Sequence, residues 1–363
     1  IYLNMWRADS VPEAAPSLVW SREEKHSIRT IIRLLCRVFE KRERRLLLEW
    51  ASWLVCNERD HPNWSPLVQG PQGIGKTLIG EIMSAALGNV NVKIIDQHVL
   101  GTGFTSWAEG AKLAIIEEVR LPGEKGTSHA VVNALKPYIT NDTISIHRKG
   151  VDPFNAPNVT GYLMFTNHED ALPVERGDRR HFVVFSRPRT EDEAKQIEEK
   201  HPTIFTDVVE AVRQHASAIR GALLHEVPRM KRSPDFNAKG RAPWTEAKAV
   251  MRDHGRPEDE SLITELLTEK FEGCNPDGVV STKHLMLRAA QIAPRLHVRS
   301  ARIGLLLRNA GWERWCGGNK LRWRNEILNV WVKVNSGLNS NMHAPTLRDL
   351  LDASVGSEFG DEV

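Results

Sequence analysis

The chain has 363 residues, of which 41% are hydrophobic and 26% charged, and its net charge is +3. This composition is ordinary for a water-soluble globular protein, and the length predicts two or three domains that each bury a core. No apolar run is long enough to cross a bilayer and no secretory signal is present, so we expect a cytoplasmic protein with no membrane partner.

The cysteines lie far apart and form no C-x-x-C pair, which favours free thiols in a reducing compartment and argues against a zinc site. They are Cys36, Cys56, Cys274 and Cys316. Because the first residue is Ile1 and not Met, we expect the chain to be part of a longer polypeptide.

Residues 1–62 are predicted to form an N-terminal helical segment. Within it, residues 21–60 carry apolar side chains at helical spacing between charged faces, which predicts one or two helices. The basic run "KRERR" at residues 41–45 is typical of a solvated helix face, and contact with a neighbouring subunit is the alternative.

Residues 63–227 are predicted to form an α/β domain. Short apolar runs alternate there with helical stretches and glycine turns, and residues 190–227 have a helical pattern. Runs of this kind predict a largely buried sheet. They are "PLVQG", "VKIID", "KLAIIEEV", "GYLMFTN" and "HFVVFS".

The strongest motif is "GPQGIGKT", residues 70–77, which matches G-x-x-x-x-G-K-[ST] between an apolar strand and an amphipathic helix. Glycines at 70, 73 and 75 allow backbone N–H groups to surround phosphates at a helix N-terminus. We expect Lys76 to reach the β- and γ-phosphates of ATP and Thr77 to ligate Mg²⁺. The motif therefore predicts a nucleoside triphosphate site.

Acidic residues follow the apolar strand at residues 113–116. We expect one of Glu117 and Glu118 to hold Mg²⁺, with Glu117 as the metal ligand, and the other to orient or deprotonate the attacking water. Because neighbouring residues on a strand point to opposite sides, the two carboxylates are expected to divide these roles.

Two further strands carry polar residues at their ends. Asn167 follows "GYLMFT" and is predicted to contact the γ-phosphate and the attacking water. Arg179 and Arg180 precede "HFVVF", where an arginine can act in trans on the ATP of a neighbouring subunit. A salt bridge to Asp178 is the alternative, and the sequence does not decide which arginine points at the ATP.

Between these motifs, Thr143–His147 alternates polar and apolar residues and leads into the turn Arg148-Lys149-Gly150. The pattern predicts a hairpin with a cationic tip. Taken alone, such a tip is a solvated turn.

Residues 228–260 are polar, rich in proline and poor in aliphatic residues, so we predict a linker. Residues 261–335 show three helices followed by a strand, a Gly-Gly-Asn turn at residues 317–319 and a second strand, the pattern of a winged helix. Residues 336–363 are predicted to form a flexible tail with a short helix. The segment from Ser281 to Asn335 contains eleven Lys or Arg residues and two acidic residues, so its net charge is +9. This favours DNA binding, with Arg299 and Arg302 among the candidates, over a helical cap with solvated arginines.

Taken together, "GPQGIGKT", "LAIIEEV", "LKPYITNDTISIHRKG", "GYLMFTN" and "GDRRHFVVF" resemble the motif set of superfamily 3 helicases, in particular the modules attached to phage, plasmid and poxvirus-type primases. The resemblance implies an AAA+-like P-loop NTPase core, a hexameric ring with ATP at subunit interfaces, and 3′-to-5′ translocation on single-stranded or forked DNA. It also implies that Lys136, His147, Arg148 and Lys149 grip DNA in the ring channel. The pair Glu117-Glu118 departs from the aspartate of many relatives.

The expected function is thus an ATP-dependent DNA helicase in the replication of a phage or other mobile element, with any primase domain upstream of Ile1. If the element is a phage, the protein acts in the host cytoplasm. A P-loop packaging or remodelling motor would not need the basic hairpin. A nucleotide kinase leaves the +9 segment without a role. An ATP-switched DNA-binding initiator without unwinding activity is a further alternative.

Overall fold

The computed structural model describes residues 7, 10–95, 105–119, 135–172, 174, 177–254, 258–296, 298–334 and 340–355. The chain divides into two compact units, Ile1–Gly255 and Arg256–Val363. The beginning of the expected N-terminal segment and much of the expected tail lie outside the described residues. Within the described ranges, no helix has the length and apolar character needed to cross a membrane.

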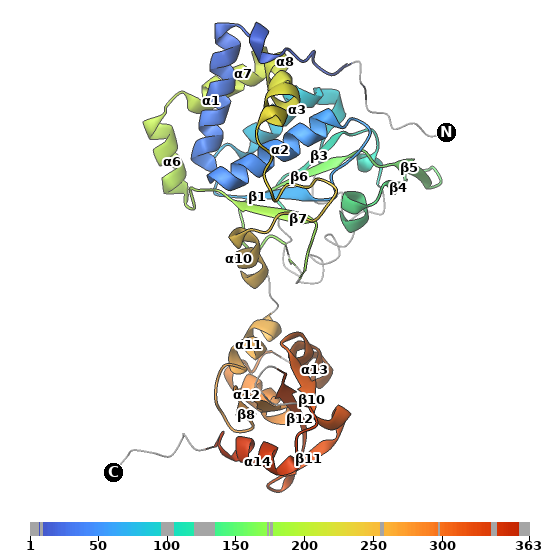
Figure 1. Cartoon of the computed structure of the whole chain (residues 1–363), viewed down its shortest axis with the longest axis vertical. Helices are drawn as coiled ribbons and strands as arrows, with labels where there is room; N and C mark the ends of the chain where they lie inside the picture. Colours follow the sequence, from blue (N-terminus) through green and yellow to red (C-terminus); the bar gives the residue numbers. More distant parts are fainter. Residues whose placement is uncertain are drawn as a thin grey trace. The chain divides into compact units, whose positions relative to one another are not determined.

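Unit 1 is built on a five-stranded parallel sheet in the order β2-β3-β6-β1-β7 (Figure 1). Each of the five predicted apolar runs supplies one strand, so the predicted α/β class with a buried sheet is confirmed. Because all strands run in the same direction, their C-terminal ends meet at one edge of the sheet. The strands are β1 (Ser65–Gln69), β2 (Val92–Ile95), β3 (Leu113–Ile116), β6 (Gly161–Thr166) and β7 (His181–Phe185).

Both faces of this sheet are covered, as expected for parallel strands that are apolar on both sides. Val68, Ile115 and Phe165 face one hydrophobic core, whereas the alternate residues Leu67 and Ile116 face a second core. The first core packs against α1 (Arg22–Val38), α2 (Lys41–Cys56), α3 (Lys76–Leu87), α7 (Ile204–Gln214) and α8 (Ala216–Gly221). The second core packs against the helical residues 135–140 and against α10 (Glu246–His254).

The predicted helical content of residues 21–60 resolves into two helices, α1 and α2. Ser21 begins α1 with a capping box, in which its hydroxyl accepts a hydrogen bond from the Glu24 N–H and the Glu24 carboxylate accepts one from the Ser21 N–H. Part of the basic run at the start of α2 is paired within the unit, since Arg42 forms an ion pair with Asp235 at 2.7 Å.

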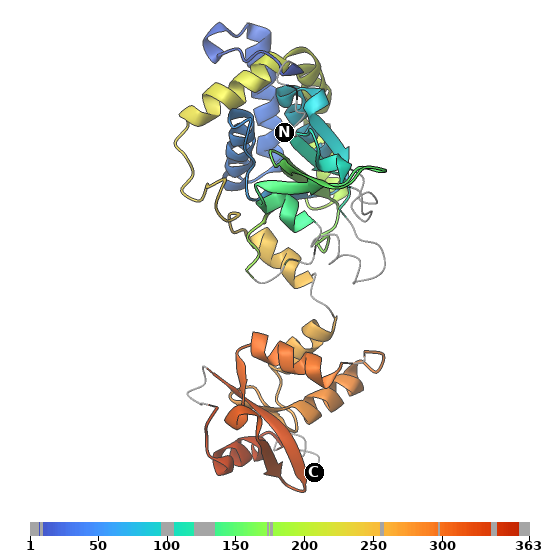
Figure 2. The same ribbon diagram turned by 90° about the vertical axis from the view of Figure 1, so that its right-hand side faces the viewer.

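A two-stranded antiparallel hairpin projects from the body of unit 1 (Figures 1 and 2). Its strands are β4 (Thr143–Ile146) and β5 (Phe154–Pro157), with Ile146 opposite Phe154. Residues 147–153 form the tip, where Gly150 adopts a φ of 75°. The tip thus carries the Arg148-Lys149-Gly150 turn expected from the sequence.

Residues 230–254 differ from the expected linker, because they pack onto unit 1. Phe236 and Ala238 are buried in the first core, and Met251 of α10 is fully buried in the second. Thr245 also donates a hydrogen bond to the Val183 carbonyl at 2.6 Å. A few well-placed apolar residues anchor a segment whose average composition indicated solvent exposure.

Unit 2 contains the three expected helices, but its hairpin differs from the expected one. The strands before and after the Gly-Gly-Asn turn do not pair with each other; both pair with β12 instead, and the hairpin turn lies at Arg324-Asn325. A sheet in the order β10-β12-β9-β8, with β11 paired to β12, packs against three helices. The elements are α11 (Glu258–Leu266), β8 (Cys274–Asn275), β9 (Val279–Ser281), α12 (Thr282–Ile292), α13 (Ser300–Asn309), β10 (Trp312–Arg314), β11 (Lys320–Trp323), β12 (Glu326–Lys333) and α14 (Ala344–Asp352). Helix α14 lies in the expected tail, but Leu347 and Leu351 are fully buried, so this part of the tail belongs to the unit.

The remaining short elements connect these parts. They are 3-10 turns at Ser17–Val19, Asn89–Asn91, Ser106–Ala108 and Trp315–Gly318, helix α6 (Glu191–Lys200), a π-helical turn at Ala222–Glu226 and α9 (Val227–Arg229).

Candidate active site

The loop between β1 and α3 has a backbone that its glycines make possible. Gly75 begins α3 with a φ of 86°, in the left-handed region, and Gly73 has a φ of 84°. At Gly70 a Cβ atom would lie 2.4 Å from the Ser186 hydroxyl and from the end of Ile74, so no side chain fits there. The three glycines of the motif therefore hold one specific turn at the C-terminal edge of the sheet.

The N-terminus of α3 has no side-chain cap and no acidic residue in its first turn. Its free N–H groups and the helix dipole favour a bound anion. Lys76, the first residue of the helix, donates hydrogen bonds to the carbonyls of Gly70 at 2.5 Å and Pro71 at 2.7 Å. Burial lowers the pKa of Lys76 to about 8, and the charge of Glu118 partly opposes this shift.

Glu117 and Glu118 both line the same cleft as this loop. Because β3 ends at Ile116, strand alternation does not determine the directions of these two side chains. Glu118 has a φ of 50°, a left-handed conformation that is unfavourable for a residue with a side chain. Strained backbone of this kind persists where the surrounding structure holds it in place, often at functional sites.

Asn167 follows β6, the strand between β1 and β3. Its side-chain oxygen Oδ1 is buried and has no hydrogen-bond partner among the described residues. The neighbouring Gln69 side chain donates a hydrogen bond to the Asn167 carbonyl at 3.2 Å, which links the ends of β1 and β6. A buried acceptor without a partner is costly unless a ligand or water satisfies it.

These residues surround a cleft of about 460 Å³. The cleft brings together seven of the predicted site residues. Gly70 belongs to the glycine loop but does not line the cleft. The lining residues are Gln72, Gly73, Gly75, Lys76, Thr77, Leu78, Glu117, Glu118, Phe165, Thr166, Asn167 and Phe205. Phe205, from α7, was not predicted, because its spacing on an amphipathic helix is that of an ordinary core residue.

The donors in this cleft fit the groups that the motif predicts. The glycine loop and the uncapped helix N-terminus offer N–H groups to phosphate oxygens, and the orphaned Asn167 Oδ1 can accept a hydrogen bond from water. The Thr77 hydroxyl and the Glu117 carboxylate are hard oxygen ligands of the type that Mg²⁺ prefers. The chemistry of the cleft is therefore compatible with a magnesium nucleoside triphosphate.

Arg179 and Arg180 lie away from this cleft, at the opposite edge of the sheet. The Arg180 carbonyl accepts a hydrogen bond from Ser65, the first residue of β1, whereas the cleft lies beyond the last. Neither arginine forms an ion pair with Asp178 in the described structure; instead Asp178 contacts Lys248 at 2.9 Å and His181 at 3.2 Å. Arg179 is exposed, and Arg180 is partly buried.

The cationic residues of the hairpin have different surroundings. Arg148 forms a bidentate ion pair with Glu109, and its guanidinium also lies over the ring of Phe154. Lys149 is exposed at the tip. The His147 backbone N–H donates a hydrogen bond to the Thr105 hydroxyl, and the His147 carbonyl accepts one from the Thr105 N–H. Lys136, on the helical residues 135–140, is partly buried. Of the two tip cations, Lys149 is thus the more exposed, whereas Arg148 is engaged by Glu109.

In unit 2, the two arginines predicted to bind DNA also differ. Arg302 forms ion pairs with Asp259 at 3.0 Å and with Glu260 at 3.5 Å, which join α13 to α11. Its charge is therefore neutralised inside the unit. Arg299 is exposed at the N-terminus of α13.

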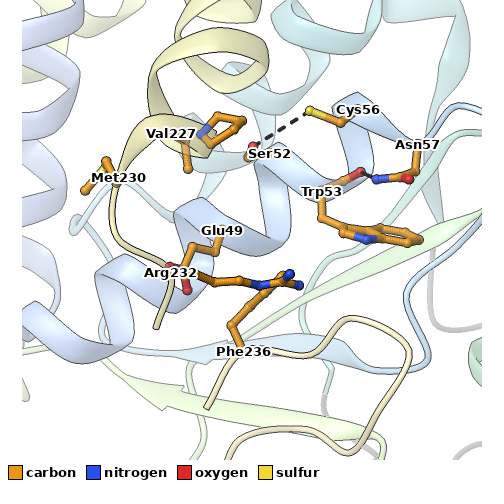
Figure 3. A pocket seen from close by; sticks show the side chains of 10 residues that line it. Glu49, Ser52, Trp53, Cys56, Asn57, Val227, Met230, Arg232 and Phe236 are labelled. Atoms are coloured by element: carbon orange, nitrogen blue, oxygen red, sulfur yellow. Dashed lines mark hydrogen bonds between the residues drawn. The ribbon is translucent and has the colours of Figure 1, made fainter. Parts of the chain in front are cut away.

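A separate cavity of about 230 Å³ lies between α2 and residues 227–236 (Figure 3). Its walls include Glu49, Trp53 and Cys56 of α2, and the Arg232 guanidinium lies over the ring of Phe236 with 5.0 Å to its centre. The predicted site residues are not among those that line it.

Comparison with known proteins finds a match between residues 68–180 and a family of unknown function, DUF5906. The matched segment includes the glycine loop, both acids and Asn167. Over 148 residues the chain is 24% identical to the DNA primase-polymerase of Nitratiruptor phage NrS-1, a match that spans 38% of this chain and only 19% of that protein.

Two solved structures of the NrS-1 C-terminal region share the fold. One apo structure aligns with a TM-score of 0.63 at 14% identity, covering 90% of this chain and 79% of the other. An apo structure described as the A form gives a TM-score of 0.57 at 14% identity, covering 90% and 78%. The chain is therefore similar in sequence to a part of a phage DNA primase-polymerase, and similar in fold to the C-terminal region of NrS-1.

Proposed function

We propose that this chain is a P-loop NTPase that binds ATP with Mg²⁺ in the cleft and hydrolyses it to move along DNA, as a superfamily 3 helicase of phage-type replication. One observation carries the proposal most strongly. Three motifs that are separated in the sequence, the loop 70–77, Glu117-Glu118 and Asn167, line one cleft at the C-terminal edge of a parallel sheet.

In this proposal, the N–H groups of the loop and of the α3 N-terminus bind the phosphates, and Lys76 moves from the Gly70 and Pro71 carbonyls to the β- and γ-phosphates. Thr77 and Glu117 would hold Mg²⁺, which neutralises charge on the phosphate oxygens when bound. Glu118 and Glu117 are the candidates to accept the proton of the attacking water. The Asn167 amide orients that water as its oxygen attacks the γ-phosphorus and the bond to the bridging oxygen breaks.

The position of Arg179 supports an assembly of several copies. It is exposed at the edge of the sheet remote from its own cleft, so it can reach a nucleotide only on a neighbouring copy. An arginine supplied in trans stabilises the charge that develops in the transition state. We therefore propose a ring, a homo-hexamer by resemblance to superfamily 3, with ATP between subunits.

DNA is the proposed polymer along which the protein moves. The exposed Lys149 at the hairpin tip would contact the phosphates of single-stranded or forked DNA, and Arg299 of unit 2 would add a second contact. His147 and Lys136 are further candidates for DNA contacts. Similarity to a phage primase-polymerase supports a role in replication, with a primase-polymerase domain in the same polypeptide.

The proposal is tested by unwinding of a forked duplex with a 3′ tail in the presence of Mg²⁺ and ATP. A helicase separates the strands, and Lys76→Ala abolishes the reaction. Hydrolysis without strand separation would favour an ATP-switched DNA-binding initiator. Translocation on duplex DNA without strand separation would favour a packaging or remodelling motor.

A further inference from the structure

Phe205 occupies an unusual place for an aromatic residue on an amphipathic helix. It is the second residue of α7 and packs only partly buried at the margin of the first core, while Val208 and Ala211 of the same helix are almost fully buried in it. Its ring lines the cleft, and a Cβ atom on Gly75 would lie 3.1 Å from its Cε1 atom. The ring thus packs against the loop directly before Lys76 and presents its remaining surface to the cleft.

The strand order gives the cleft two chemically different ends. The acids follow β3, which is separated from β1 by β6, whereas the Phe205 ring lies against Gly75, in the loop that follows β1. Carboxylates and Asn167 line one end, where the γ-phosphate and Mg²⁺ are proposed to sit. The aromatic ring lies at the other end, where the part of the nucleotide remote from the γ-phosphate would lie.

The chemistry of that end suits a flat aromatic group. Phe205 offers an apolar π face there, and Leu78 of α3 is a further apolar residue that lines the cleft. Stacking of a base on an aromatic side chain contributes about 1–3 kcal/mol. An aromatic residue that only held α7 in the core would gain more from complete burial than from a place at the cleft.

We propose that Phe205 is the nucleobase-binding surface of the site, on which the base of the bound nucleotide stacks. The inference rests on the proposed function, since it takes the cleft to be a nucleoside triphosphate site. It adds an element that the motif set does not contain, and it separates recognition of the base from recognition of the phosphates.

The test compares two probes that differ in whether they carry a base, a slowly hydrolysed ATP analogue and inorganic tripolyphosphate, each with Mg²⁺. Phe205→Leu keeps the apolar contact with Gly75 but removes the π face. We expect it to weaken binding of the analogue about 5- to 150-fold, the equivalent of the stacking free energy, and to leave tripolyphosphate binding within about twofold. Phe205→Trp retains binding of the analogue.

Val212→Ala is the matched control, because Val212 packs partly buried on the same helix and does not line the cleft. It should change binding of neither probe. Equal weakening of both probes by Phe205→Leu, or of neither, would overturn the role of Phe205. Lys76→Ala tests the nucleotide site separately from the role of Phe205. It should weaken binding of both probes, and if it weakens neither, the assignment of the nucleotide site is wrong.

Discussion

The ammonium group of Lys76 lies 2.5 Å from the backbone carbonyl oxygen of Gly70, at the start of its own loop. The Pro71 carbonyl is a second acceptor at 2.7 Å. The positive charge is therefore held inside the loop and partly removed from water. Phosphates that bind to this loop must compete with the two carbonyls for Lys76, so the protonation of this group contributes to how strongly they bind.

Nucleotide binding is expected to weaken as the pH rises above about 8. Burial lowers the pKa of Lys76 to about 8, and phosphate binding requires the protonated form. The charge is thus fully present below this pH and is lost as the pH rises through it. Titration of a nucleotide analogue between about pH 6.5 and 9.5 measures the effect. Lys76→Arg, which stays charged, should abolish this pH dependence; an unchanged profile would contradict the assignment.

Glu118→Gly should stabilise the protein and inactivate it. Glycine accepts the φ of 50° without the steric cost that Glu118 carries, so the free energy of unfolding should rise by about 1 kcal/mol. Hydrolysis should fall about 100-fold or more if this carboxylate handles the water proton. Cys316→Gly, at a φ of 44° in unit 2, is the control and should leave hydrolysis unchanged. Full activity of Glu118→Gly would assign the proton to Glu117.

Arg179 is expected to act on the nucleotide of a neighbouring copy. Arg179→Ala and Lys76→Ala should each be inactive alone, because the first lacks the arginine and the second lacks phosphate binding. When the two are mixed, an intact Lys76 site can meet an intact Arg179, so hydrolysis should reappear. Absence of recovery in mixtures that form assemblies would show that Arg179 acts only within its own subunit.

The hairpin tip should couple hydrolysis to DNA movement. Lys149→Ala should leave basal hydrolysis and thermal stability unchanged but abolish unwinding, whereas Lys149→Arg retains the charge and should unwind. Arg148→Ala is expected to lower the free energy of unfolding by about 1 kcal/mol, because it leaves the mostly buried Glu109 carboxylate without its partner. Normal unwinding by Lys149→Ala would refute the role of the tip.

Much of the site could be predicted because its residues follow local rules. The glycines of the loop are required by backbone geometry that the motif itself encodes, and the acids and Asn167 directly follow apolar strands. The strands were equally clear, since each is a short apolar run. Their order was not predictable, because the insertion of β6 between β1 and β3 depends on contacts between distant segments.

The ion pairs and the packing of residues 230–254 could not be predicted from the sequence, because they depend on residues far apart along the chain. The pairing of Arg148 with Glu109 spans 39 residues, and that of Arg302 with Asp259 spans 43. Both arginines were predicted to bind DNA because nothing local distinguishes a paired arginine from a free one. Residues 230–254 fell within the predicted linker, residues 228–260, for a similar reason, since their three buried apolar side chains are diluted in a polar segment.

The central claim is that the cleft of unit 1 powers movement on DNA. Its most direct test is the rate of ATP hydrolysis with and without single-stranded DNA, in the unaltered chain and in Lys76→Ala. We predict hydrolysis that single-stranded DNA stimulates and that Lys76→Ala abolishes. Hydrolysis that persists in Lys76→Ala, or that DNA does not stimulate, would contradict the account.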